Sequence, residues 1–150
     1  MDKPEFDVAE AHRWFAIECN NRAWDLVESE SRSEEEREEL LMTASSAAWH
    51  WKQIGKPLNN LRAQVLLATA AIVADDESQA RRSVANCLQL LTEIDDVPDF
   101  DLACTHAVSA ASARMDGNLD ESKQHFVQFD KLAAKLDEES QKLLSSLYRK

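Results

Sequence analysis

His12 and His50 are the residues whose types and spacing most directly suggest chemistry. They are equally distant along the chain from Ser31, the centre of a polar run between two amphipathic stretches. If these stretches form an antiparallel helical hairpin, the two imidazoles lie at equivalent heights and can face each other. With Glu10 or Cys19 nearby they could bind zinc, which takes nitrogen, sulfur and carboxylate ligands. This predicts a metal site at His12 and His50 as one alternative for function.

The other reading of these histidines is a pair of surface or hydrogen-bonded side chains. The chain contains no HxxxH, HExxH or paired ExxH motif, which metal-dependent hydrolases and di-iron bundles carry. His106 and His125, on either side of a later turn, give no stronger signal. A helical bundle with a His-based metal site and hydrolytic or sensory activity therefore stays the alternative to a protein without metal.

Signatures of other enzyme classes are missing from the sequence. There is no GxSxG motif and no Ser-His-Asp ordering, and Gly55 and Gly117 are the only glycines, too few for a phosphate-binding loop. We therefore predict a protein that is not an enzyme and has no cofactor.

Tryptophan is confined to the first two amphipathic stretches, at Trp14, Trp24, Trp49 and Trp51. These side chains form either a buried seam or an exposed patch of the kind found at interaction hot spots, on which Arg13 and Lys52 could stack. Trp49 and Trp51 are about 200 degrees apart on a helix, so both cannot point inward. Trp14, Trp49 and Trp51 are thus candidate partner-binding residues.

The elements that must position these side chains are helices. Apolar residues recur at three- and four-residue steps, while two glycines and three prolines fall between the periodic stretches. The pattern predicts an all-α protein of six to seven helices, at about residues 5–28, 34–54, 58–74, 77–94, 100–115, 119–136 and 138–148. The third is the most apolar and is expected to be central.

Composition limits the partners and the compartment. The 150 residues suit a single domain, residues 1–150, and the net charge of -11 opposes binding to nucleic acid or to an anionic membrane. No signal peptide or membrane-spanning run is found, and the three cysteines fit reduced core residues, so we expect a cytoplasmic protein.

Two helical pairs are similar to each other when the turns 76–80 and 118–122 are aligned at a spacing of 42 residues. Small and bulky apolar residues then match, at Leu67, Ala68, Ala71, Ala80, Val84 and Cys87 in one pair and at Ala110, Ala113, Ser122, Phe126 and Phe129 in the other. On these positions the chain resembles the tetratricopeptide-repeat family, with helices longer than in its usual repeat of ~34 residues. An irregular helical bundle is the alternative.

The resemblance implies stacked antiparallel hairpins in a right-handed superhelix and a scaffold or adaptor that binds a protein or peptide. Family members that bind peptide carboxylates use cationic groove residues, whereas the inward positions here are Val65, Thr69, Cys104 and Val108. The partner is therefore expected in a helical groove of different chemistry or on the Trp-bearing first hairpin, with Arg62 and Arg81 as further candidate contacts. A homodimer, and a small ligand between the second and third helices, remain open.

Overall fold

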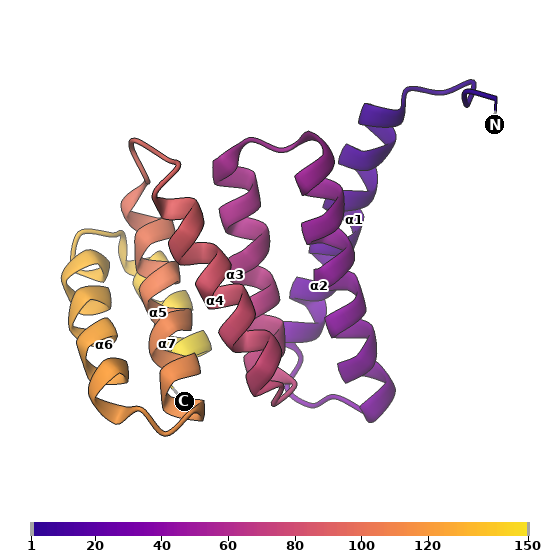
Figure 1. Cartoon of the computed structure of the whole chain (residues 1–150). Coiled ribbons are helices and arrows are strands. Elements are labelled where there is room, and N and C mark those ends of the chain that lie inside the picture. The colour runs from indigo at the N-terminus through magenta and orange to yellow at the C-terminus, as the bar shows by residue number, and fades with distance from the viewer. Residues whose placement is uncertain (1, 150) are drawn as a thin grey trace.

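The computed structural model describes residues 2–149, and these form α-helices without strands (Figure 1). The helices are α1 (Val8–Glu28), α2 (Glu34–Ile54), α3 (Pro57–Val73), α4 (Glu77–Leu91), α5 (Asp99–Met115), α6 (Leu119–Ala133) and α7 (Glu138–Tyr148). The predicted all-α fold of stacked antiparallel hairpins is confirmed. No helix in the described residues combines the length and apolar character needed to cross a membrane.

Most helices begin at a side-chain cap that the sequence indicates. The Ser33 hydroxyl accepts the backbone N–H of Glu36, whose carboxylate accepts the N–H of Ser33, so the predicted capping box is present. Asp7, Asp76, Asn118 and Asp137 cap their helices in a similar way. These local hydrogen bonds explain why most predicted starts agree with the structure.

Three predicted bounds are wrong, each for a local reason. The first helix begins at Val8 and not near residue 5, because the Asp7 carboxylate accepts the first free backbone N–H groups and fixes the start there. The fourth and sixth helices end at Leu91 and Ala133, before residues 94 and 136. Beyond each end the chain makes a single tighter turn, in which a backbone N–H donates to the carbonyl three residues earlier.

The α3–α4 and α5–α6 hairpins turn in the same way at the predicted 42-residue spacing. Asp75 and Gly117 both have a positive φ, of 61° and 76°. The residues that follow, Asp76 and Asn118, each donate a backbone N–H to the carbonyl five residues earlier, at 2.8 and 2.9 Å. This pattern is the usual end of a helix at a left-handed residue. The two hairpins thus share turn geometry as well as sequence pattern.

The hairpins stack side by side, and in the view of Figure 1 α2 lies in front of α1 and α4 in front of α3, while α6 lies beside α5. Helix α3 contacts α1, α2, α4 and α5, which confirms its predicted central position. One core cluster joins α1, α2 and α3, and a second joins the later helices.

The last helix, α7, packs behind α5 as Figure 1 shows. Leu144 and Tyr148 are buried in the second core cluster, beside residues of α3 and α5. The Tyr148 hydroxyl lies 2.7 Å from the Thr69 hydroxyl. Burial raises the pKa of Tyr148 well above the ordinary value for tyrosine. Helix α7 therefore covers one face of α3 and α5 with Leu144 and Tyr148.

Candidate functional site

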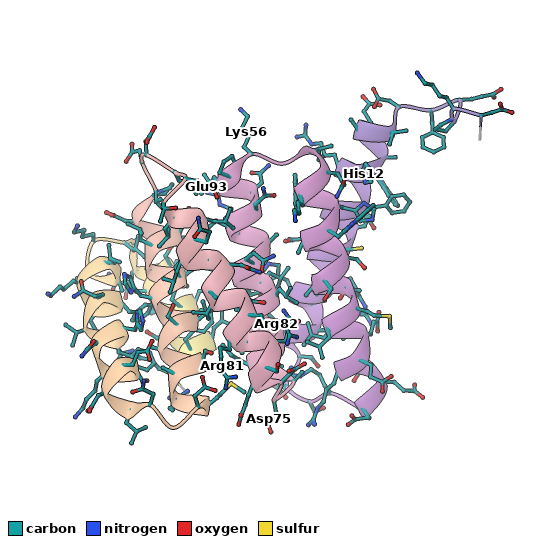
Figure 2. The ribbon with its side chains drawn as sticks, viewed as in Figure 1. His12, Lys56, Asp75, Arg81, Arg82 and Glu93 are labelled. Carbon is teal, nitrogen blue, oxygen red and sulfur yellow. The ribbon has the colours of Figure 1, made fainter. Side chains whose placement is uncertain are left out.

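The first hairpin carries an exposed cluster of aromatic side chains, which we call the aromatic patch: His12, Trp14, Phe15, Trp49 and His50. Trp14, Phe15 and Trp49 are 59%, 47% and 54% exposed. Figure 2 shows His12 towards the edge of the molecule at which Lys56 and Glu93 lie, whereas Asp75 and Arg81 lie towards the opposite edge. Single exposed apolar side chains are normal on a protein surface, whereas a contiguous apolar patch can mark a contact surface.

Ring contacts make the aromatic patch continuous. The His12 and His50 rings each contact Trp49, with centroids 5.2 and 5.0 Å apart, and Phe15 stacks on His50 at 5.5 Å. Trp14 extends the row through an edge-to-face contact with Phe15 at 5.1 Å. Such contacts hold exposed rings in fixed orientations, so a partner that docks on them orders few side chains.

The two histidines of the aromatic patch meet directly. Their Nδ1 atoms lie 2.8 Å apart, so one ring donates an N–H to the other. Burial lowers the pKa of His50, and the neighbouring His12 lowers it further, so the folded protein favours a neutral His50. This contact joins α1 to α2 at the end of the hairpin away from its turn.

Two arginines hold the same hairpin nearer its turn. Arg22 forms a bidentate ion pair with Glu39, at 2.6 and 2.7 Å, and thereby links α1 to α2. Arg32 donates to three carbonyl groups at the end of α1, which has no glycine cap there. These bonds and the histidine contact fix the relative placement of the two helices that carry the aromatic patch.

The other tryptophans lie outside the aromatic patch. Trp51 is half-buried, and Trp24 is half-buried against the core cluster of the first three helices. Arg13 and Lys52 are exposed, and the cation–π contacts among the described residues do not include them on Trp14 or Trp49. Of the predicted aromatic contact residues, Trp14 and Trp49 are brought together with the histidines and Trp51 is not.

The candidate residues Arg62 and Arg81 lie away from the aromatic patch and bind carboxylates of this chain. Arg62 on α3 pairs with the buried Asp101 on α5, at 2.8 and 3.0 Å. Arg81 on α4 pairs with Asp116 after α5, at 2.6 and 3.1 Å, and the hydrogen bond from Arg81 lowers the pKa of that carboxyl. Both arginines join neighbouring hairpins, a role that the sequence reasoning missed because the partners are far apart in the chain.

The inward groove positions of the two later hairpins are covered. Val65, Thr69, Cys104 and Val108 are all buried, and α7 packs over this face. Burial also raises the pKa of the Cys87 and Cys104 thiols to about 12, in agreement with reduced core cysteines. A peptide could reach this part of the groove only by displacing α7.

One cavity lies on the same side as α7 and not between α2 and α3, where the sequence left a small-ligand pocket open as a possibility. It has a volume of about 450 Å³ and is lined by residues of α1, α3, α5 and α7, among them Trp24, Arg62, Asp101 and Leu147. A hollow of about 230 Å³ does lie between α2, α3 and α4, and Ala48, Asn60 and Gln64 line it.

The structure brings together a second histidine pair, His106 and His125, whose Nδ1 atoms are 3.0 Å apart. No group of three or more His, Cys, Asp or Glu side chains in residues 2–149 is placed to hold a metal ion. Either pair would thus offer a metal two protein ligands.

Comparison with known proteins gives no significant match: no model of a protein family, no curated protein and no solved structure aligns with this chain. The geometry of the site is therefore the basis for assigning function.

Proposed function

We propose that the protein is a non-enzymatic interaction module of tetratricopeptide-like type, which binds a protein partner through the aromatic patch of its first hairpin. The observation that carries this proposal is the continuous row of rings in that patch, of which Trp14, Phe15 and Trp49 are exposed. The turn geometry shared by the two later hairpins supports the repeat relationship. A cytoplasmic location is part of the same proposal.

The size of the aromatic patch is sufficient for an anchor. A tryptophan side chain offers up to about 250 Å² of surface, so two half-exposed tryptophans and one phenylalanine present on the order of 300 Å². This reaches the range at which apolar patches on monomeric proteins are often functional. Tryptophan is also enriched among residues that dominate binding energy, near the centre of the contact.

The first hairpin is favoured over the groove because the groove is filled. Helix α7 covers the inward positions of α3 and α5 with Leu144 and Tyr148, both nearly inaccessible. The aromatic patch lies on the first hairpin, where more than half of Trp14 and of Trp49 stays exposed. A partner can reach these rings without any part of the fold moving.

The test is affinity capture of partners with the wild type and two variants. Trp49→Ala removes the exposed tryptophan that contacts both histidines of the aromatic patch, whereas Met42→Ala removes a side chain of the same helix that is 64% exposed and outside the patch. We expect a partner retained by the wild type and by Met42→Ala but lost with Trp49→Ala. The solution mass of the isolated protein, measured in parallel, shows whether the partner is a second copy. A partner retained equally by all three proteins would contradict the proposal.

A further inference from the structure

The third hairpin contains a histidine pair that the interaction function does not use. His106 on α5 and His125 on α6 approach through their Nδ1 atoms at 3.0 Å, with ring centroids 5.3 Å apart and planes tilted by 42°. Both rings are half-buried and line an open hollow of about 400 Å³ together with Gln124, Val127 and Gln128. The two half-buried rings therefore border a space that small solutes can reach.

The surroundings of His125 favour a free lone pair on its Nδ1. The Glu121 carboxylate, one helical turn earlier, lies 3.9 Å from Nε2 on the other side of the ring. A carboxylate on that side favours the tautomer that carries its proton on Nε2, leaving Nδ1 as the acceptor. Histidines that bind metals commonly have a carboxylate behind the ring in this way.

The fold itself does not require histidines at these positions. At the 42-residue spacing, the positions in the preceding hairpin that correspond to His106 and His125 hold Gln64 and Ser83. Ser83 is buried, and its hydroxyl accepts a hydrogen bond from Gln79 at 2.8 Å. The same turn geometry and helix packing are thus compatible with residues that do not bind metals strongly.

We propose that His106 and His125 together bind one transition-metal ion of the class that prefers imidazole, Zn²⁺ or Cu²⁺, through their Nδ1 atoms. Water completes the coordination from the hollow. Zinc binds imidazole nitrogen at about 2.0–2.1 Å, so two tetrahedral ligands lie about 3.3–3.4 Å apart. The observed 3.0 Å has to open by a few tenths of an ångström, and both rings have to turn so that their Nδ1 lone pairs point to the metal. His106 also has to take the tautomer with its proton on Nε2, in place of the Nδ1–H that it donates to His125 in the metal-free pair.

The first histidine pair lacks these features. His12 and His50 are closer, at 2.8 Å, and both rings pack against Trp49 while Phe15 stacks on His50. Among residues 2–149, only Glu121 lies within ion-pair distance of a histidine, and that histidine is His125. The first pair thus has no such carboxylate behind either ring. The ring contacts resist the opening that a metal needs, so the metal site belongs to the third hairpin.

The test is a titration with ZnCl₂ at neutral pH, followed by equilibrium dialysis and by the NMR signals of the histidine rings. The wild type should bind one equivalent, and the ring signals of His106 and His125 should shift. His106→Gln with His125→Ser, which copies the preceding hairpin, should abolish this binding. His12→Gln with His50→Ser is the matched control and should keep it.

A further variant leaves both ligands in place. Glu121→Gln removes the carboxylate behind His125 and should weaken zinc binding about tenfold, the loss typical for such a partner. It keeps the proposal testable even if the double variant does not fold, which circular dichroism would reveal. An absence of zinc binding in the wild type, equal binding by both double variants, or shifts confined to His12 and His50 would each overturn the proposal.

Discussion

The first and third hairpins make the same contact between two imidazoles, but in different surroundings. His12 and His50 lie in a row of exposed aromatic rings, whereas His106 and His125 border a hollow with a carboxylate behind one ring. In the first hairpin the histidines contact the exposed rings of a surface, and in the third they border an open hollow. The neighbours of a histidine pair, more than the pair itself, determine what it can do.

The same two hairpins also differ in how they are covered. Helix α7 packs over α5 and contributes Leu144 and Tyr148 to the core, while the aromatic patch on α1 and α2 has no such cover in residues 2–149. Substitutions in the two regions should therefore separate folding from binding.

The largest predicted difference in stability is between the variants Leu144→Ala and Trp49→Ala. Leu144 is 1% exposed, so its truncation leaves a cavity under α7 and should lower the free energy of unfolding by about 3 kcal/mol. Trp49 is more than half exposed, and its truncation should change stability by less than about 1 kcal/mol. Urea unfolding of the two variants measures both. Equal losses would mean that the aromatic patch is part of the core and not a free surface.

Removal of Arg62 should destabilise the fold more than removal of Arg81, although both arginines join neighbouring hairpins. Arg62→Ala leaves the Asp101 carboxylate, 4% exposed, without its bidentate partner, and should cost about 1–2 kcal/mol because the guanidinium side is open to solvent. Arg81→Ala leaves the more accessible Asp116, which water can solvate, and should cost less. Neither substitution should alter partner binding, since both residues lie away from the aromatic patch. Thermal unfolding and a binding assay decide this, and the reverse stability order would contradict the burial argument.

The smallest effect concerns pH. The pKa of His50 is lowered in the folded state by burial and by His12, so between the ordinary histidine pKa of about 6.5 and that lowered value the unfolded chain binds more protons. Its contribution to stability is thus fully present above the ordinary value and decreases as pH falls through this window. His50→Asn should reduce the decrease in melting temperature between pH 7.5 and 5.5. An unchanged pH dependence would show that the His50 ring titrates alike in both states.

Much of the fold could be predicted because helix periodicity and caps are local. The Ser33 capping box, the repeated turns at Asp75 and Gly117, and the central position of α3 all follow from neighbouring residues in the sequence. The approach of His12 and His50 follows from their equal distance from the turn of one hairpin.

Contacts that depend on packing between distant segments could not be predicted. The amphipathic pattern of α7 indicates that one face is buried but not which helices cover it, and Asp101 lies in a different hairpin from Arg62. His106 and His125 are at unequal distances from Gly117, so the symmetry that pairs the first two histidines does not reveal the second pair.

The most direct test of the account is photo-crosslinking at single positions of the full chain. A photoreactive amino acid with an aromatic ring, which keeps a ring at position 49, replaces Trp49 in the aromatic patch, Leu143 beside the cavity under α7, or Met42 as an exposed reference. We predict a specific crosslinked product, with a partner protein or a second copy, from position 49 and not from positions 143 or 42. A product from position 143 with none from position 49 would contradict the account and assign partner binding to the groove.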